Sequence, residues 1–259
     1  MRNILLTIAY DGTDFCGWQR QPGRKTVCGE LELALAALTG RAVKLNGASR
    51  TDAGVHARGQ RASFELPDEG IPTERLPKAL NDMLAKDRLE GVGAIRVLEA
   101  REMPSDFHAR FCARGKRYIY KIYNGPDKDV FRRTRFYEVT AAPLDIGAMR
   151  AAAAYITGTH DFKCFESAGS TPRESTVRTV FRLDVEPRAA ADGAPEIDMI
   201  IEGDGFLYNM VRIIAGTLVE AGLGRRSPGS VAAAIDSKDR ANAGHTAPPQ
   251  GLYLDEVFY

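Results

Sequence analysis

Apolar positions along the first part of the chain switch between the spacing of strands and the spacing of helices. Strands are predicted over residues 4–10, 43–45, 62–66 and 92–98, and helices over 27–38 and from Thr73 to Leu84. Thr26 is placed to cap the first helix and Gly40 to end it, and Thr73 to cap the second. The only tryptophan, Trp18, is expected to be a core residue.

The pattern restarts after an irregular segment, residues 104–111, which reads as a connection. Strands are predicted over 118–123, 177–185, 197–201 and 252–257, and helices over 144–156, over 209–218, and from a Ser227 cap to Ile235. The sequence therefore predicts an α+β (mixed α/β) fold. We expect two similar halves, residues 1–104 and 105–259, with largely antiparallel sheets joined side by side and helices on the outer face.

The loop over residues 46–60 concentrates chemically useful side chains between two predicted strands. It contains three glycines, His56, Arg50 and Arg58, and one acid, Asp52. A carboxylate between two arginines stays ionised at neutral pH and faces whatever the arginines face. The hypothesis is that Asp52 is a nucleophile acting on a polyanion; the alternative is an aspartate that caps a turn.

Positive charge is segregated although the net charge is only +1. Residues 19–61 hold eight Lys/Arg against three Asp/Glu, and residues 110–135 hold nine against two. These windows carry +5 and +7, so the remainder carries −11. Such segregation is expected if one face meets phosphate, whereas two solvated basic faces are the plainer alternative.

The cysteines and histidines argue against a metal site. The four cysteines are far apart without a CxxC pair, and the four histidines do not cluster with them. No stretch reaches the roughly twenty apolar residues of a membrane span, and no signal-peptide pattern begins the chain. A reducing cytoplasm fits this composition.

A single carboxylate limits the chemistry of the loop. Glycosidases usually need two carboxylates, metal-dependent nucleases need an acidic cluster, and Ser49 lacks the spacing of a nucleophile elbow. Nucleophilic help at a sugar carbon, without net hydrolysis, would suit one aspartate on an RNA-binding surface. Arg212 lies beside a buried helical stripe and therefore needs an acid or another acceptor.

Several motifs together resemble the bacterial tRNA pseudouridine synthase A family. They occur in the family's order over nearly the whole chain, and RTDAGVH is the most specific. The motifs are DGT at 11–13, GWQRQ at 17–21, RTDAGVH at 50–56, DFHARF at 106–111, RYIY at 117–120, NMVR at 209–212 and GLYL at 251–254.

The resemblance implies isomerisation of uridine to pseudouridine at positions 38–40 of the tRNA anticodon arm, by a cofactor-free homodimer. Asp52 resembles the catalytic aspartate and Tyr118 the tyrosine that stacks on the target base. Arg212 resembles the arginine that pairs with the aspartate, Arg50 the residue that holds the flipped nucleotide out, and Leu252 a residue under the base. The site would lie in a cleft between the halves. Candidates for tRNA phosphate contacts are Arg20, Arg58, Arg110, Arg114 and Lys116.

The same residues are compatible with other interpretations. Tyr118 by itself would suit a core and Arg212 a structural ion pair, while His56 and His108 are expected to be structural hydrogen-bonding residues. The sequence departs from the family pattern at Ser49, where glycine is commoner, and around residues 84–87. A non-catalytic RNA-binding module and a hydrolase that releases uracil are the alternative functions.

Overall fold

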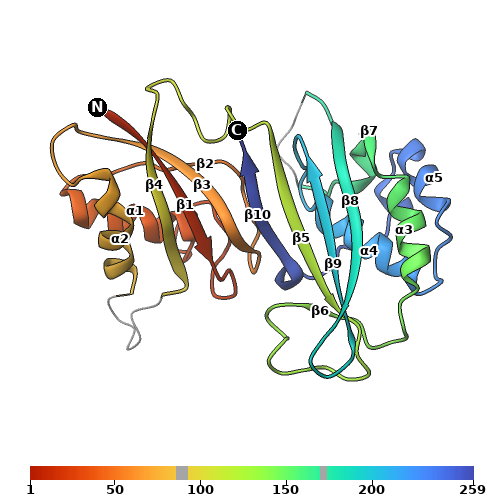
Figure 1. The fold of residues 1–259 in the computed structure, drawn as a ribbon. Helices are drawn as coiled ribbons and strands as arrows, with labels where there is room; N and C mark the ends of the chain where they lie inside the picture. Colours follow the sequence, from red (N-terminus) through yellow and green to blue (C-terminus); the bar gives the residue numbers. More distant parts are fainter. Residues whose placement is uncertain (86–92, 170–173) are drawn as a thin grey trace. The chain divides into compact units, whose positions relative to one another are not determined.

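A computed structural model describes residues 1–85, 93–169 and 174–259 and divides the chain into two compact units (Figure 1). The first unit comprises Met1–Arg114 with Tyr253–Tyr259, and the second comprises Gly115–Leu252. The division therefore falls ten residues after the predicted boundary at 104/105. Residues 105–114 stay with the first unit because their backbone is tied to it: the Ala109 N–H donates to Ser63 Oγ at 3.0 Å.

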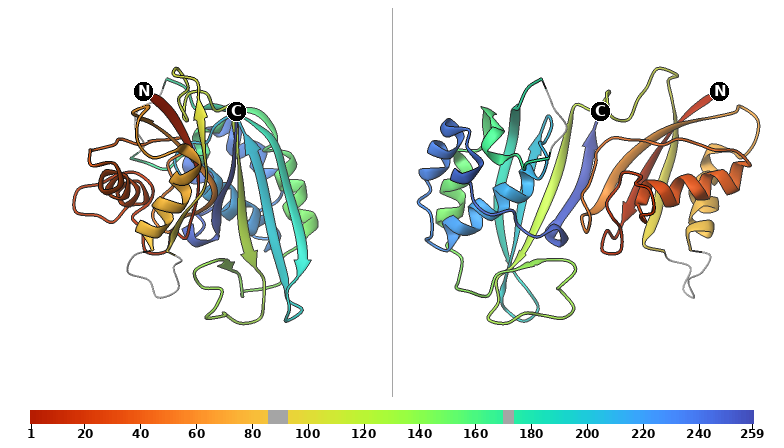
Figure 2. Two further views of the ribbon diagram at one scale, coloured as in Figure 1. Left: turned by 60° about the vertical axis from the view of Figure 1, so that its left-hand side comes forward. Right: turned by 180° about the vertical axis from the view of Figure 1, so that it is seen from behind.

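The first unit is a sheet covered by two helices. The strands β4, β1, β3 and β10 follow one another in the sheet, and β2 pairs with β3. All these pairs are antiparallel except β10 with β3, which is parallel. Figures 1 and 2 show both helices on the same face of this sheet. The bounds are β1 Arg2–Tyr10, α1 Val27–Thr39, β2 Asn46–Gly47, β3 His56–Leu66, α2 Leu76–Leu84, β4 Ile95–Met103 and β10 Leu252–Phe258.

The second unit is likewise a sheet with packed helices. The strands β5, β9, β8 and β7 follow one another in antiparallel pairs, and β6 adds in parallel to β5. The helix α3 packs on α4 and β8, and α4 packs on β5. The bounds are β5 Gly115–Tyr123, β6 Tyr137–Glu138, α3 Ile146–Ala154, β7 Gly158–Asp161, β8 Val177–Ala189, β9 Pro195–Gly203, α4 Met210–Gly222 and α5 Ser230–Ser237. Short 3₁₀ turns occupy Thr73–Arg75, Phe162–Phe165, Arg240–Asn242 and Pro249–Gly251.

The predicted fold class, a mixed α/β protein with largely antiparallel sheets, is confirmed within each unit. The cap residues of α1 are confirmed too: Thr26 Oγ accepts from the Gly29 N–H, and Gly40 takes the left-handed conformation at φ 71°. The 177–185 and 197–201 runs form the predicted hairpin. Trp18 is 1% exposed, as expected of a core residue.

Several predicted boundaries in the first half are wrong for identifiable reasons. Residues 43–45 form no strand, because the Leu45 N–H donates to the carboxylate of Glu32 at 3.0 Å instead of to a neighbouring strand. Residues 56–60, expected in the loop, are the first part of β3. Thr73 does not cap α2; its hydroxyl donates to Glu102.

The later boundaries show smaller differences. Ser227 does not cap α5, which begins three residues later after Gly229, and the Ser227 carbonyl accepts from the Ser230 N–H. The strand predicted over 92–98 is β4, beginning at Ile95, and residue 92 lies outside the described residues. Residues 86 and 87, part of the departure from the family pattern, also lie outside them.

Candidate functional site

Asp52 lies in the connection between β2 and β3 of the first unit, next to a buried residue, Thr51, whose side chain is held in place. The Asp52 side chain is half-buried, Arg50 is exposed, and Thr51 between them is buried. The Thr51 and Tyr10 hydroxyls are 2.7 Å apart in a buried hydrogen bond. The residue before the aspartate is therefore fixed to the end of β1.

Backbone hydrogen bonds hold the aspartate loop to the segment that follows β1. The Trp18 N–H donates to the Thr51 carbonyl at 3.0 Å, and the Gly54 N–H donates to the Phe15 carbonyl at 3.3 Å. The Val55 N–H closes a turn on the Asp52 carbonyl at 3.1 Å. The carboxylate thus stands on a loop whose two sides are both anchored.

Two glycines in the segment after β1 allow this close approach. A Cβ on Gly17 would lie 2.5 Å from the Thr51 carbonyl oxygen, and Gly17 has φ 86°, which side chains rarely adopt. A Cβ on Gly12 would lie 2.0 Å from the Val55 carbonyl oxygen. The DGT and GWQRQ motifs therefore serve as the bed of the aspartate loop, a role that sequence reasoning did not give them.

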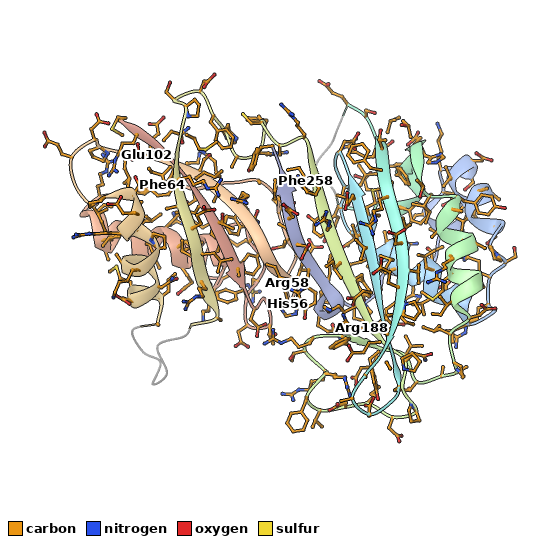
Figure 3. The ribbon with its side chains drawn as sticks, viewed as in Figure 1. His56, Arg58, Phe64, Glu102, Arg188 and Phe258 are labelled. Carbon is orange, nitrogen blue, oxygen red and sulfur yellow. The ribbon has the colours of Figure 1, made fainter. Side chains whose placement is uncertain are left out.

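His56, at the start of β3, completes this bed. Its side chain is 1% exposed, its Nδ1 accepts the Gly12 N–H at 3.1 Å, and its ring stacks on Tyr253 of β10 at 4.6 Å between centroids. These contacts support the expectation that His56 is a structural hydrogen-bonding residue. Figure 3 shows His56 and Arg58 on the same strand.

Gln60 is a site residue that sequence reasoning missed. Its side chain is fully buried and binds the backbone of Ser49, at the other end of the loop from His56. The sequence does show a glutamine four residues after the RTDAGVH motif. The alternation of a strand, however, does not predict which group its side chain binds.

Tyr118 occupies β5 in the second unit. It is 5% exposed and meets the ring of Phe206 edge-on, with 5.1 Å between centroids. Tyr118, Tyr120 and Ile122, which alternate along the strand, are all buried. The tyrosine ring is therefore held in a fixed orientation next to the segment that leads into α4.

Arg212 lies in the first turn of α4. Its Nε donates to the Ala247 carbonyl at 2.8 Å and its Nη1 to the Asn209 side-chain oxygen at 2.8 Å. Asn209 itself takes the left-handed conformation at φ 61°. A guanidinium at a helix N-terminus adds to the positive end of the helix dipole, so this end of α4 favours an anion.

Arg212 also influences buried Tyr120. Burial raises the pKa of the Tyr120 hydroxyl well above its ordinary value, and the nearby charge of Arg212 opposes that rise. The Tyr120 hydroxyl donates to the Pro248 carbonyl at 2.7 Å. In the second unit, β5, the start of α4 and the 247–252 segment therefore converge around one arginine.

Leu252 begins β10 and is 6% exposed. It follows Gly251, where a Cβ would lie 2.9 Å from the Tyr120 ring and 2.8 Å from the Lys121 carbonyl oxygen. Gly251, the first residue of the GLYL motif, is thus packed closely against β5, and only glycine fits at this position.

The predicted phosphate contacts are placed on the surface. Arg20, Arg58, Arg110 and Arg114 are exposed, and Lys116 is half-buried. Arg20 lies 3.6 Å from Glu32, Arg58 lies over the Tyr253 ring at 5.4 Å, and Arg110 over the Phe111 ring at 5.8 Å.

The described residues contain neither a metal-binding cluster nor a membrane-spanning helix. No group of three or more His, Cys, Asp or Glu side chains there is arranged to hold a metal ion. No helix among them is long and apolar enough to cross a membrane.

A family model described as tRNA pseudouridine synthase matches residues 6–112 and 151–259. The chain belongs to this family. It is 47% identical to tRNA pseudouridine synthase A of Acetivibrio thermocellus and 47% identical to that of Lysinibacillus sphaericus, with all of both chains covered in each case. It is 45% identical to tRNA pseudouridine synthase A of Caldicellulosiruptor bescii, again over all of both chains. The resemblance predicted from the motifs is confirmed.

The matched segments can be compared with the candidate residues. They include Asp52, Arg50, Arg212 and Leu252, whereas Tyr118 lies in the stretch 113–150 between them. The relatives cover that stretch as well, since they align with the whole chain.

Proposed function

We propose that this protein isomerises uridine to pseudouridine in the anticodon stem-loop of tRNA. Family membership supports this activity, and relatives that carry the name tRNA pseudouridine synthase A match the chain from end to end. The observation that carries the proposal to a residue is Asp52, the only acid of its loop, on a backbone anchored from both sides.

In this proposal Asp52 acts on the ribose of the target nucleotide. The bond between C1′ and N1 of uracil breaks while the carboxylate either bonds to C1′ or takes a proton from the adjacent C2′. The detached uracil turns and re-bonds to C1′ through C5, which releases the carboxylate from C1′ in the first case and returns the proton to C2′ in the second. The hydrogen lost from C5 is balanced by the one gained at N1, so the product has the mass of the substrate, and neither a metal nor a cofactor is needed.

A uridine inside a stem must first leave the helix, which costs a few kcal/mol. Stacking on Tyr118 offsets part of that cost, since one aromatic contact to a base contributes about 1–3 kcal/mol. Arg50 is exposed beside Asp52 and is proposed to keep the flipped nucleotide out, while Leu252 packs under the base. The edge-on contact of Tyr118 with Phe206 and the burial of Leu252 support these roles.

Arg212 is proposed to pair with the Asp52 carboxylate when tRNA has excluded water. A neighbouring guanidinium keeps a carboxylate ionised and oriented, which a nucleophile requires. The support is the position of Arg212 at the positive end of α4, oriented by two amide oxygens. An ordinary structural arginine would gain more at a helix C-terminus.

The decisive experiment is Asp52→Asn, which keeps the shape of the side chain and removes its charge. We expect pseudouridine formation in tRNA to fall by at least about a thousandfold, as when a covalent nucleophile is lost. Binding of tRNA should change by less than about threefold, because the carboxylate does not contact phosphate. Asp14→Asn, at an exposed aspartate of the same unit, is the matched control.

The outcome separates the three candidate functions. An Asp52→Asn variant that still makes pseudouridine at the wild-type rate would overturn the mechanism. A non-catalytic RNA-binding module would bind tRNA without converting it, and a hydrolase would release free uracil and leave an abasic site. Release of tritium from tRNA labelled at uracil C5, with no free uracil, is expected only of the isomerase.

We further propose a homodimer that acts in the cytoplasm, where its tRNA substrate is. The four cysteines are free thiols, which suits a reducing compartment. Light scattering at micromolar concentration is expected to give twice the 28.3 kDa mass of the chain.

A further inference from the structure

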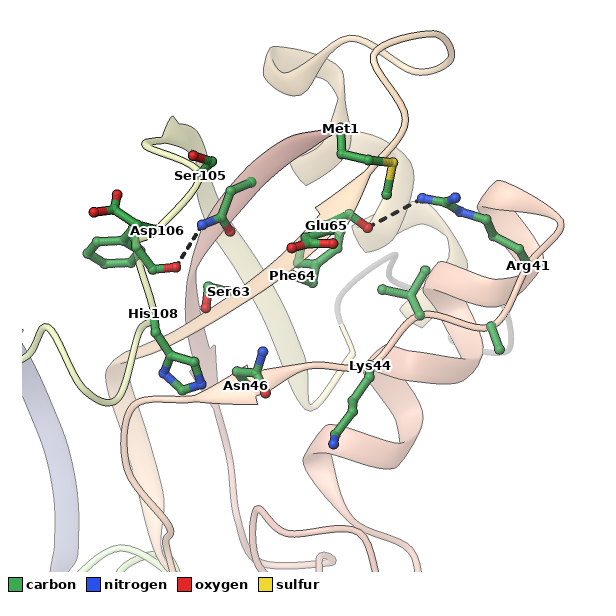
Figure 4. A pocket seen from close by; sticks show the side chains of 14 residues that line it. Met1, Arg41, Lys44, Asn46, Ser63, Phe64, Glu65, Ser105, Asp106 and His108 are labelled. Atoms are coloured by element: carbon green, nitrogen blue, oxygen red, sulfur yellow. Dashed lines mark hydrogen bonds between the residues drawn. The ribbon is translucent and has the colours of Figure 1, made fainter.

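A polar cavity in the first unit is formed without Asp52 or the residues on either side of it. It has a volume of about 480 Å³ and is formed by the connection after α1, by β3 and by residues 105–108 (Figure 4). This volume is within the range of about 300–1,000 Å³ usual for small-molecule sites. Asp106, Phe107 and His108 of the DFHARF motif, which the proposed reaction does not use, form one wall.

Two side chains of this cavity are available to a ligand. Among the residues that the structure describes, neither Lys44 nor the Asn46 amide has a hydrogen-bond or ion-pair partner. The backbone of Asn46 is nevertheless fixed, because β2 pairs Asn46 with Ser63 of β3. Figure 4 shows Lys44, Asn46 and His108 along the same side of the cavity. The amide of Asn46 on β2 and the cation of Lys44, two residues before that strand, are therefore presented together.

The wall that contains residues 105–108 is held in place by hydrogen bonds between its backbone and neighbouring side chains. The Asn3 amide donates to the Phe107 carbonyl at 2.7 Å, and the Ala109 N–H donates to Ser63 Oγ at 3.0 Å. His108 Nδ1 accepts the Arg110 N–H at 3.1 Å, which fixes the imidazole. The cavity is thus preformed.

An exposed aromatic side chain stands beside this wall. Phe111 is 76% exposed, and its ring centroid lies 4.4 Å from that of His108. The Arg110 guanidinium lies 5.8 Å from the centre of the Phe111 ring. Unpaired bases stack on exposed aromatic rings and on arginine guanidinium planes, and Phe111 with Arg110 offers both.

We propose that this cavity binds one unpaired nucleotide of the RNA substrate, other than the uridine that is isomerised. Lys44 meets its phosphate, Asn46 meets the edge of its base, and Phe111 stacks on it or on its neighbour. Glu65 and Asp106 also line the cavity. Their carboxylates accept from base amino groups and disfavour a second phosphate, so a single nucleotide fits better than a polyphosphate.

This inference rests on the proposed function only in taking RNA as the ligand. Binding of a nucleotide in the cavity would fix the register of the RNA on the first unit, since phosphate contacts position a nucleic acid and base contacts select it. Loss of the contact should therefore weaken tRNA binding and leave the chemical step unchanged.

The test is a double variant, Lys44→Ala with Asn46→Ala, in the full-length protein. We expect KM for tRNA to rise about tenfold and kcat to stay within about twofold, as when uniform binding is removed. Lys78→Ala, an exposed lysine on α2 paired with Asp82, is the matched loss of charge and should change neither constant. A double variant with the KM of Lys78→Ala would overturn the proposal.

The stacking contact has a conservative rescue. Phe111→Ala should raise KM as well, whereas Phe111→Trp should restore it, because tryptophan offers a larger stacking face. Equal KM values for Phe111→Ala and wild type would remove the aromatic part of the proposal.

Free nucleotide is distinguished from RNA by competition. Millimolar AMP should inhibit the wild type competitively against tRNA and should not inhibit the double variant in that way. AMP that binds without competing with tRNA would mean a site for a free nucleotide, and the proposal would fail.

Binding of tRNA is measured in parallel with the Asp52→Asn protein, in which no chemistry occurs. If the wild type bound tRNA but made no pseudouridine, the proposed function would fail while the binding result for the cavity would stand.

Discussion

The side-chain amide of Gln60 makes two hydrogen bonds to the backbone of Ser49, one to its carbonyl and one to its N–H. The Gln60 Nε2 donates to the Ser49 carbonyl at 2.8 Å, and its Oε1 accepts the Ser49 N–H at 3.3 Å. The same oxygen accepts the Arg61 N–H at 3.1 Å. One fully buried amide therefore replaces a strand partner at the point where the aspartate loop leaves β2.

Replacing Gln60 by glutamate should disorder the loop. The new carboxylate oxygen would face the Ser49 carbonyl in place of an N–H donor, leaving two buried acceptors together. We expect a loss of about 1–3 kcal/mol in the free energy of unfolding, and a kcat for pseudouridine formation at least tenfold lower. Urea unfolding and single-turnover kinetics measure the two effects.

The Gln60→Ala variant serves as the comparison for that experiment. It removes the same hydrogen bonds without adding charge, so it should lie between wild type and Gln60→Glu in both measurements. If both variants kept the wild-type kcat, the grip on Ser49 would have no part in positioning Asp52.

A methyl group at Gly47 should also be costly. A Cβ there would lie 2.3 Å from Trp18 Nε1, and Trp18 is 1% exposed, so neither side can move freely. Overpacking of this kind costs about 1–3 kcal/mol. We expect Gly47→Ala to lower the urea midpoint at unchanged m value. Activity should fall as well, because a displaced Trp18 would disturb the hydrogen bond from its backbone N–H to the Thr51 carbonyl, next to Asp52.

Gly229 provides the control for this substitution. A Cβ at Gly229 has only the Tyr155 hydroxyl within reach, at 4.0 Å, and the residue has φ −64°. Gly229→Ala should leave stability within about 0.5 kcal/mol of wild type. A Gly47→Ala protein as stable as Gly229→Ala would show that the loop bed tolerates repacking.

The second unit contains a carboxylate whose charge should stabilise the fold at neutral pH. Hydrogen bonds from Thr176 and Lys238 hold the pKa of Asp161 below its ordinary value of 3.8. A depressed carboxylate pKa contributes stability above the unfolded-state value, and that contribution is lost as pH falls through the lower folded-state value. The contribution should be complete at neutral pH and decline below about pH 4.

Asp161→Asn tests this because asparagine still accepts the Lys163 N–H at the start of the 3₁₀ turn. We expect a loss of about 1 kcal/mol at pH 7 that shrinks as pH falls below about 4, measured by urea unfolding. Lys238→Gln, which removes the cation 2.9 Å from Asp161, should show the same pH trend. A difference from wild type that stays constant down to pH 3 would contradict the assignment.

The sequence predicted elements well where local spacing decides them, and less well where tertiary contacts do. Thr26 and Gly40 define α1 through their own backbone preferences, so they could be predicted. The failure at Leu45 came from Glu32, a helix side chain that takes the backbone donor a strand would have used. The hydrophobic periodicity of the sequence does not reveal such a contact.

The candidate site shows the same division. The motifs named Asp52, Tyr118 and Arg212 as candidates. The supports of the loop could not be predicted in this way, because Gly12 contacts His56, 44 residues further along the chain, and Gln60 acts through a buried side-chain amide. Such residues are found only once the backbone path is known.

The last prediction concerns Arg58, an exposed arginine whose direction is set by its position 5.4 Å over the Tyr253 ring. If it contacts a tRNA phosphate, Arg58→Gln should weaken tRNA binding and reduce the slope of log K against log salt concentration by about one. Glutamine preserves most of the length of the side chain, so the comparison isolates charge. Arg101→Gln, at an exposed arginine of β4 bonded to Glu99 at 2.6 Å, should keep the wild-type slope. Filter binding between about 50 and 200 mM salt measures both. Equal slopes for the two variants would show that Arg58 does not contact phosphate. Any phosphate contacts of the basic segment 19–61 would then be made by its other Lys and Arg side chains.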